Sequence, residues 1–428
     1  MGIFIFLTVV VFELVFAFFC IITKSNQQIK RNIIRIAAFV GFVLFTLVTI
    51  IQWSLRYYTL AALLFLLAVI GAVSLIGKRK EKKLYSAGHV VLKAIGMTVL
   101  IFMFTLPSII FPQYKAIKPT GKYQVATINY SYTDELRIET YRDTGEARVL
   151  NVEMWFPKNA DATFPLIVFS HGAFGMKSSN TSLYNELASH GYVVCSIDHT
   201  YQCLYTKGQD GHTILMDMRY MNEVSAEDSL SDKQQSYEYY QKWMKIRTDD
   251  INFVIDHILT ETKNKDADRV YKLVDKAKIG VMGHSLGGSA ALGIGRMRND
   301  VSAVIALESP FMCDIKGVKD GEFVFTDEIY PVPVLNIYSD GIWSIMSKRP
   351  QYEENSALLS NTNEKAFNIH ISGVGHLTLT DLALESPFLT RIINGKKSTT
   401  DSYYCLKIIN KACLEFFDSY LKGEHKFT

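Results

Sequence analysis

The amino-acid sequence predicts an α/β fold, in which a mostly parallel sheet has helices on both faces and four transmembrane helices precede it. Three observations support this prediction. The first 112 of the 428 residues are mostly apolar, whereas the remainder has the mixed composition of a globular domain. In that remainder, short apolar runs alternate with helical patterns, which is typical of parallel sheets. One run leads directly through Gly-His-Ser-Leu-Gly into a helix of small residues.

Four apolar stretches in the N-terminal part are each long enough to cross a bilayer as a helix. They run from Ile3 to Thr23, Ile33 to Ile51, Tyr58 to Gly77 and Val90 to Phe111. One cleaved signal peptide cannot account for four stretches, and none shows the polar stripe of a surface helix. We therefore expect a membrane domain over residues 1–112. Glu13 either faces neighbouring helices or forms a site within the membrane, and we favour a position facing its neighbours.

Basic residues in the short connecting segments predict the orientation of these helices, because positive segments stay in the cytoplasm. The first segment contains Lys24, Lys30 and Arg31, and the second contains only Arg56. The third contains Lys78, Arg79, Lys80, Lys82 and Lys83. We expect the N-terminus and the chain beyond Phe111 to be extracytoplasmic, although Lys115, Lys118 and Lys122 argue mildly against this. The Lys-, Asn- and Ile-rich composition is typical of an AT-rich bacterial genome, so we expect the membrane to be the cell membrane of a bacterium.

Charge and cysteine spacing exclude some classes of function. The formal net charge is +3, which implies no large acidic or basic partner, so we expect no nucleic-acid binding. The six cysteines show no C-x-x-C or zinc-type spacing. The cysteines therefore predict no zinc site, and we expect no cofactor.

After a linker over residues 113–122, the pattern predicts a globular domain over 123–428. Residues 123–132, 136–141 and 147–157 alternate apolar and polar side chains, as half-buried antiparallel strands do. Buried strands follow at 166–169 and 192–198, and an amphipathic helix follows at about 245–263. We expect a polar helical insertion at about 201–243, beside the pocket.

The run Ile279–Met282 leads into Gly283-His284-Ser285-Leu286-Gly287, a G-x-S-x-G nucleophile elbow in its proper strand–turn–helix context. Small neighbours are required there because strand and helix approach closely at a sharp turn. We predict that Ser285 is a nucleophile. The alternative is a glycine-rich turn in an ordinary α/β core.

A second glycine-bearing turn predicts the oxyanion hole. The buried strand Leu166–Phe169 runs into His171-Gly172-Ala173-Phe174-Gly175, where such hydrolases place a backbone donor. We predict that the amides of Ala173 and Leu286 bind the oxyanion; the alternative is a plain strand-to-helix turn.

The three strands after the elbow each end at a polar residue. Strand 301–307 ends at Glu308, strand 331–339 ends at Asp340, and strand 366–372 leads to His376. The chain order is serine, acid, histidine, as this type of hydrolase requires, so His376 is the predicted general base. The acid is Glu308 or Asp340. The weaker candidates His171, His199 and His284 are expected to support loops by hydrogen bonding, and the alternative for His376 is a surface loop histidine.

The chain resembles the α/β-hydrolases, and within them the platelet-activating-factor acetylhydrolase (isoform II, plasma type) family, from about Tyr123 to Leu421. The resemblance rests on seven motifs in the family's order: FSHGAFG, SIDHTY, RTDDINFVIDHI, VMGHSLGG, VIALESP, PVLNIYSD and GVGHLTLTDLAL. It implies a metal-free serine esterase acting on short or oxidised acyl chains of phospholipids. The family's ALD motif reads ALE here, which favours Glu308 as the acid. The four predicted spans have no counterpart in the secreted members.

We therefore expect a membrane-anchored serine esterase or lipase that forms an acyl-enzyme on Ser285 and hydrolyses small-molecule or lipid esters. Two alternatives stay open: an envelope acyltransferase with the same fold, and a non-catalytic membrane protein that uses the fold for binding.

Overall fold

The computed structural model describes residues 1–77, 85–227, 230–360 and 365–427, which form two compact units. The first unit comprises Met1–Lys115 with Leu384–Leu389, and the second comprises Ala116–Ala383 and Thr390–Thr428. Each unit is described by itself below.

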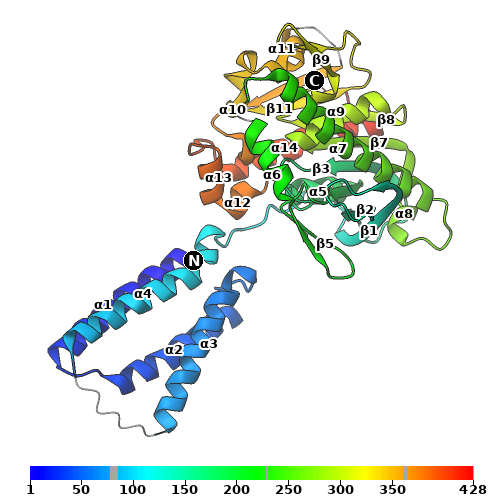
Figure 1. Cartoon of the computed structure of the whole chain (residues 1–428). Helices are drawn as coiled ribbons and strands as arrows, with labels where there is room; N and C mark the ends of the chain where they lie inside the picture. The colour runs from blue at the N-terminus through cyan, green and yellow to red at the C-terminus, as the bar shows by residue number, and fades with distance from the viewer. Residues whose placement is uncertain (78–84, 228–229, 361–364, 428) are drawn as a thin grey trace. The chain divides into compact units, whose positions relative to one another are not determined.

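The first unit consists of long apolar helices arranged in pairs (Figure 1). They are α1 (Gly2–Ile22), α2 (Gln28–Leu47), α3 (Tyr58–Ile76) and α4 (Ala87–Ile110). Helix α1 packs against α4, and α2 packs against α3. Glu13 of α1 pairs with Arg31 of α2 at 3.2 Å, and both side chains are largely buried. The expectation that Glu13 faces a neighbouring helix is therefore confirmed.

Within the described part of the chain, three helical segments are long and apolar enough to cross a membrane: Gly2–Ile22, Leu55–Ile76 and Ala87–Ile110. The predicted span Ile33–Ile51 is not among them. Helix α2 ends at Leu47, and its first turns contain Lys30, Arg31 and Arg35, which would be costly in the centre of a bilayer. The cationic segment 78–83, on which the predicted orientation depended, lies outside the described residues.

The second unit is built on an eight-stranded sheet with the order β1-β2-β4-β3-β7-β8-β11-β12. The strands are β1 (Val125–Ile138), β2 (Ala147–Pro157), β3 (Phe164–Ser170), β4 (Val193–Asp198), β7 (Val274–His284), β8 (Val301–Leu307), β11 (Val334–Ser339) and β12 (Ala366–Ile371). Strand β2 pairs antiparallel with both β1 and β4, and the six strands from β4 to β12 in this order are parallel to one another. The predicted mostly parallel sheet is confirmed.

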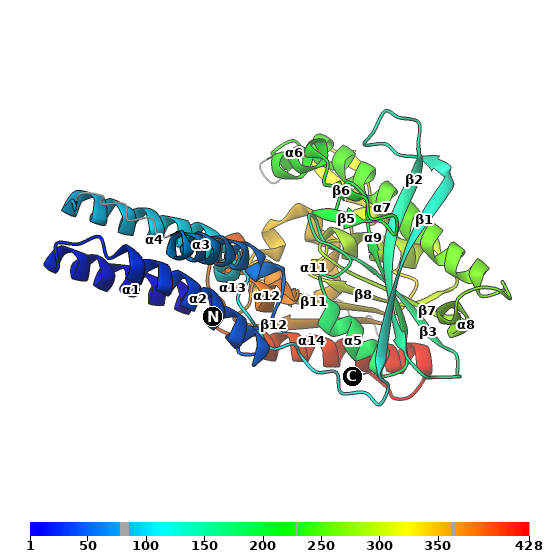
Figure 2. The ribbon, with the colours of Figure 1, turned by 90° about the horizontal axis from the view of Figure 1, so that it is seen from below.

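Helices cover both faces of this sheet (Figure 2). Helices α5 (Thr181–Ser189) and α14 (Ser402–Phe417) lie on one face, and α7 (Lys233–Glu261) and α9 (Leu286–Met297) lie on the other. Shorter elements complete the unit: α8 (Arg269–Lys272), β9 (Ile315–Lys319), β10 (Glu322–Phe325), α10 (Asp340–Trp343) and α11 (Glu353–Ser360). The short helices α12 (Leu382–Glu385) and α13 (Pro387–Ile393) each contain residues of both units. Because both faces are covered, strands β3, β4 and β11 are buried along their whole length.

Two local predictions differ from the structure. The first two predicted strands are one strand, β1, with an irregular register between Asp134 and Ile138. The predicted helical insertion contains a hairpin, β5 (Tyr205–Lys207) with β6 (Thr213–Leu215), followed by α6 (Met218–Glu227). The hairpin forms because the turn between its strands contains Gly211 at φ 85°, a conformation that favours glycine.

Helix α7 is longer than predicted and absorbs the end of the insertion. Asp232 caps its first turn by accepting hydrogen bonds from the backbone amides of Gln234 and Gln235. No proline or glycine interrupts the 29 residues that follow. One continuous helix therefore runs from the rim of the unit down to the sheet.

Candidate active site

Ser285 lies at the turn between β7 and α9, where the backbone is strained. Its φ and ψ are 55° and −128°, a region that residues with a side chain rarely adopt. A Cβ added to Gly283 would lie 2.4 Å from the backbone of Gly287, and one added to Gly287 would lie 2.0 Å from the carbonyl oxygen of Ser170. The small residues of the motif are therefore required by close backbone packing on both sides of the serine.

His376 and Glu308 form a hydrogen-bonded pair near this turn. His376 Nδ1 lies 2.7 Å from Glu308 Oε1, and the other carboxylate oxygen accepts a hydrogen bond from the Ser339 amide at 2.6 Å. The Glu308 side chain is 1% exposed, whereas that of His376 is 36% exposed. Burial alone would raise the pKa of Glu308, but hydrogen bonds from His376 and Ser339 outweigh burial and hold this pKa below its usual value. The carboxylate is thus charged and fixed.

The His376 ring also contacts the residue that precedes the serine. Its centroid lies 4.4 Å from that of His284, and His284 Nε2 lies 3.2 Å from the carbonyl oxygen of His376. Among the described residues, Ser285 Oγ makes no hydrogen bond. Such contacts are often long before a substrate binds. Serine, acid and histidine therefore follow the carboxyl ends of β7, β8 and β12, three parallel strands at the same edge of the sheet, with β11 between β8 and β12.

Asp340 pairs with a different histidine. Its carboxylate lies 2.8 Å from His370 Nε2 and accepts a hydrogen bond from the Gly373 amide, also at 2.8 Å. Hydrogen bonding from Gly373 and then His370 lowers the pKa of Asp340. The Asp340 side chain is 33% exposed. Asp340 thus holds the turn that leads to His376, whereas Glu308 contacts His376 itself.

The predicted oxyanion donors flank the serine. Leu286 is the first residue of α9, so its amide belongs to the unpaired N-terminal turn of that helix. Ala173 follows Gly172, whose added Cβ would lie 3.1 Å from Ser285 Cβ. Phe174 adopts φ 59° and turns the chain away after Ala173. The glycine-bearing loop therefore packs directly against the elbow.

The three weaker candidates, His171, His199 and His284, are buried and hydrogen-bonded within loops. Burial lowers the pKa of His171 and of His284 well below the usual value, and it lowers the pKa of His199 to about 4. His199 lies between Ser170 and Asp250, at 2.7 and 2.8 Å.

Sequence reasoning missed Arg247 and Asp250, which lie buried beside these histidines. A signal was available. Both positions fall on the apolar face of α7 that Ile251 and Val254 define, and a charge on such a face indicates a buried polar network.

One group of potential metal ligands occurs among the described residues. Donor atoms of His171, Asp198 and Cys203 lie within 4.8 Å of one another. Both ring nitrogens of His171 are already used: Nδ1 donates to the next carbonyl at 2.6 Å, and Nε2 accepts from the His199 amide at 3.2 Å. Asp198 accepts a hydrogen bond from Thr206. These donors serve the loops, and we assign no metal to them.

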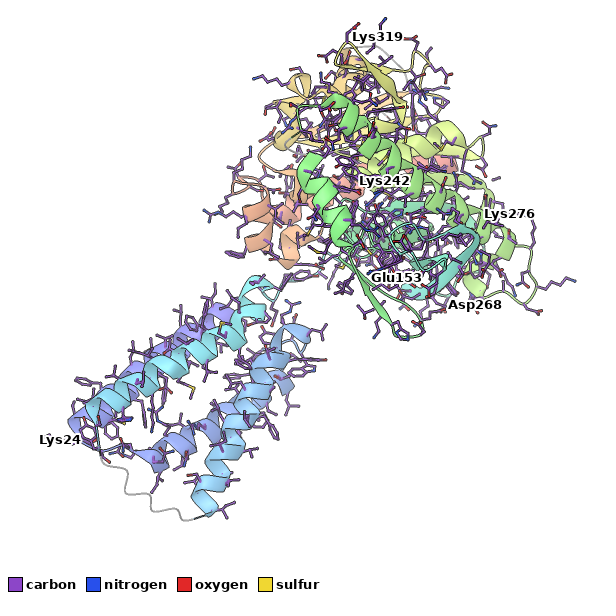
Figure 3. All side chains as sticks on the ribbon, in the orientation of Figure 1. Lys24, Glu153, Lys242, Asp268, Lys276 and Lys319 are labelled. Atoms are coloured by element: carbon purple, nitrogen blue, oxygen red, sulfur yellow. The ribbon has the colours of Figure 1, made fainter. Side chains whose placement is uncertain are left out.

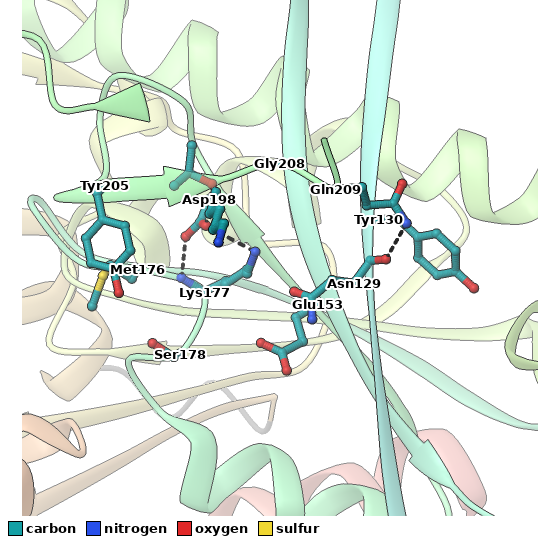
Figure 4. A pocket seen from close by; sticks show the side chains of 12 residues that line it. Asn129, Tyr130, Glu153, Met176, Lys177, Ser178, Asp198, Tyr205, Gly208 and Gln209 are labelled. Atoms are coloured by element: carbon teal, nitrogen blue, oxygen red, sulfur yellow. Dashed lines mark hydrogen bonds and ion pairs between the residues drawn. The ribbon is translucent and has the colours of Figure 1, made fainter. Parts of the chain in front are cut away.

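A pocket of about 450 Å³ lies apart from the serine, between the β5–β6 hairpin, the middle of β1 and β2 and the end of β4 (Figure 4). Glu153, Lys177 and Asp198 line it, and Lys177 pairs with Asp198 at 3.5 Å. Figure 3 shows Glu153 and Lys242 among the side chains of the same unit. Neither Ser285 nor His376 lines this pocket, so the catalytic chemistry lies elsewhere.

Comparisons with known proteins identify a family for this chain. Residues 145–428 match the family described as platelet-activating factor acetylhydrolase, isoform II. A platelet-activating factor acetylhydrolase from Canis lupus familiaris is 27% identical over 286 residues, which is 62% of this chain and 59% of the relative. The Bos taurus protein of that name is 24% identical over 283 residues, again 62% and 59% of the two chains. The match thus spans about three fifths of the length of these relatives.

A solved structure shares the fold. The ferulic acid esterase from Streptomyces cinnamoneus superposes with a TM-score of 0.53 and 21% identity, covering 72% of this chain and 93% of that chain. At this identity the likeness establishes the fold alone.

Proposed function

Because the chain belongs to the platelet-activating factor acetylhydrolase, isoform II, family, we propose that it is a membrane-attached serine hydrolase of carboxylic esters. The observation that supports this most directly is the hydrogen bond between His376 and the buried Glu308 carboxylate, near a serine held in a strained turn. A carboxylate that orients an imidazole toward a strained serine is the arrangement that acyl transfer requires.

The proposed reaction proceeds in two halves. His376 Nε2 accepts the Ser285 proton while Oγ bonds to the ester carbonyl carbon, and the carbonyl electrons move to its oxygen. The amides of Ala173 and Leu286 stabilise that oxyanion. The oxyanion electrons then re-form the carbonyl, the bond to the alcohol oxygen breaks as His376 protonates that oxygen, and an acyl-enzyme remains. Water attacks this ester while His376 takes its proton, and the second intermediate collapses as His376 returns a proton to Ser285 Oγ and the acid product leaves.

Glu308 keeps its charge throughout this cycle. Its lowered pKa favours the carboxylate, which fixes the proton of neutral His376 on Nδ1 and stabilises the imidazolium that forms. Asp340 acts one step further away, by holding the turn before His376.

We further propose that the substrate is a lipid-like ester. The N-terminal domain over 1–112 would anchor the hydrolase over 123–428 at a membrane through the linker 113–122, so enzyme and lipid would share a surface. Three apolar segments support this attachment.

The side of the membrane depends on helix α2. If α2 also crosses, the catalytic domain lies on the same side as the N-terminus, which we favour as extracytoplasmic; if it does not, the two ends lie on opposite sides. Epitope tags at both ends, tested by protease treatment of intact cells, distinguish these arrangements.

The hydrolase is tested with the full chain in detergent on p-nitrophenyl esters from acetyl to dodecanoyl. Ser285→Ala should abolish both hydrolysis and labelling by a fluorophosphonate. Labelling without hydrolysis, combined with acyl transfer to an added alcohol, would indicate an acyltransferase. A wild-type chain that neither labels nor hydrolyses any ester contradicts the proposal.

A further inference from the structure

The loop His171–Gly175 carries the proposed oxyanion donor Ala173 and is called the oxyanion loop below. Behind it lies a second array of serine, histidine and aspartate. Asp250 accepts a hydrogen bond from His199 Nδ1 at 2.8 Å, so the neutral Nε2 of His199 accepts one from the Ser170 hydroxyl at 2.7 Å. All three residues are buried, with exposed fractions of 0% for Ser170, His199 and Asp250. Arg148 holds Asp250 through two bonds of 2.6 Å. No substrate can reach this array, so it is not a second catalytic triad.

Arg247 holds the same loop from a second point. It lies one turn before Asp250 on α7 and is completely buried. Its guanidinium donates to the carbonyl oxygen of His171 and lies 3.5 Å from that of Gly172. Its Nε donates a hydrogen bond to Gln202 Oε1 at 2.8 Å, which fixes the guanidinium plane. Hydrogen bonds from a charged donor are about twice as strong as neutral ones.

These two attachments act on the three residues that come directly before Ala173. In a trans peptide group, C=O and N–H point in opposite directions, and no cis peptide occurs among the described residues. The Gly172 carbonyl and the Ala173 amide belong to one peptide group. The Gly172 carbonyl oxygen accepts a hydrogen bond from His171 Nδ1 at 2.6 Å, and the Arg247 guanidinium lies 3.5 Å from it. Arg247 also donates to the preceding carbonyl, that of His171, so it holds the loop just before Ala173 and with it the direction of the Ala173 N–H.

We propose that Arg247 and the Ser170–His199–Asp250 array are positioning residues of the oxyanion hole, by which helix α7 aims the Ala173 N–H at the developing oxyanion. The inference rests on the proposed esterase function and adds the residues that set its oxyanion geometry. Gly172 packs against Ser285, so a displacement of this loop would change the position of the oxyanion hole relative to the ester carbonyl carbon that Ser285 attacks.

The test compares Arg247→Met, Arg247→Lys and Ser170→Ala in the full chain. Losing one oxyanion donor costs about 10²–10³ in kcat. We expect Arg247→Met to lower kcat by about 10- to 100-fold with KM nearly unchanged. The loss should be smaller than that of a whole donor, because the Ala173 N–H remains and only its orientation changes. Arg247→Lys should recover part of the loss, and Ser170→Ala should cost less than Arg247→Met. Titration with fluorophosphonate corrects each rate for the fraction of folded sites.

A double-mutant cycle separates positioning from general damage. Ala173→Pro removes the proposed donor, so Arg247→Met should cost less than about 3-fold in that background. An equal loss in both backgrounds would overturn the inference, as would an unchanged kcat in Arg247→Met. Arg296→Met is the matched control, because Arg296 forms a similar pair with Asp314 away from the loop, at 2.6 and 2.7 Å. It should lower the melting temperature without lowering kcat.

A second readout does not depend on the proline variant. A trifluoromethyl ketone forms a tetrahedral adduct that needs the oxyanion hole, so Arg247→Met should weaken its binding by the same factor as kcat/KM. Tight binding that is unaffected by Arg247→Met would refute positioning. If the wild type neither hydrolyses esters nor labels, the proposed function fails instead, which is a different outcome.

Discussion

Replacing Glu308 by Gln should remove almost all ester hydrolysis while leaving the fold intact. Glu308 accepts hydrogen bonds from His376 Nδ1 at 2.7 Å and from the Ser339 amide at 2.6 Å. A glutamine has only one acceptor oxygen, so one of these donors loses its partner. If the amide N–H faces Nδ1, the histidine carries its proton on Nε2 and cannot accept the proton of Ser285.

The magnitude follows from this tautomer change. In a serine triad, replacing the acid by its amide lowers kcat by about 10⁴-fold, which corresponds to about 5 kcal/mol. We expect a loss of about 10³- to 10⁴-fold for Glu308→Gln, because the Ser339 amide competes for the remaining oxygen. Initial rates on p-nitrophenyl acetate, normalised by fluorophosphonate titration and compared with the melting temperature, measure it.

Asp340→Asn is the matched control, since Asp340 also lies at a strand end and pairs with a histidine. Because its carboxylate contacts His370 and the Gly373 amide rather than His376, we expect a loss below about 10-fold. Glu308→Asp should fall between the two variants, because the side chain is one methylene shorter. A large loss of kcat in Asp340→Asn together with a nearly unchanged kcat in Glu308→Gln would refute the assignment of Glu308 as the acid.

Three further predictions concern stability. Burial and the neighbouring Arg247 guanidinium lower the pKa of His199 from 6.5 to about 4, so between these pH values the unfolded chain binds a proton that the folded chain does not. The free energy of unfolding should therefore fall by up to about 3 kcal/mol on acidification from pH 6.5 to 4. Urea unfolding at a series of pH values measures this, and a free energy that does not change with pH contradicts it. Gly287→Ala should lower the melting temperature and activity, because the new Cβ would lie 2.0 Å from a carbonyl oxygen of the oxyanion loop, whereas Gly317→Ala, with open space around it, should be neutral in the same scan. Glu13→Gln leaves Arg31 without its charged partner and should lower the melting temperature of the detergent-solubilised chain, while unchanged melting would show that the pair contributes nothing.

Much of the sheet could be predicted because its signals are local. Continuous apolar runs mark strands buried on both faces, and the glycines around Ser285 mark a close approach of strand and helix. The family suggested by seven motifs is confirmed. The β5–β6 hairpin was missed although its turn contains Asp210-Gly211, a hairpin signal, because the helical pattern of the residues that follow was extended over the whole insertion. Helix α2 was misjudged because its apolar run hides the cost of Lys30, Arg31 and Arg35 at its start.

The supporting residues of the site were harder to predict, because their partners are distant in sequence. Arg247 contacts carbonyls 75 and 76 residues away, and no local pattern encodes a backbone acceptor. Its place on the apolar face of α7 indicates that it is buried, but only the fold shows what it holds. The same limit applies to Asp250, whose partner His199 lies 51 residues away.

The choice between the two acids illustrates why residue type and order do not determine a triad. Glu308 and Asp340 end adjacent parallel strands, and each pairs with a histidine from the β12 region. They differ in burial and in the histidine they reach. Glu308 has φ 49° and a side chain only 1% exposed, against 33% for Asp340, so water screens its interaction with His376 far less. A buried carboxylate on a residue with a strained backbone contributes little to the free energy of folding by itself. This favours a role for Glu308 in orienting His376.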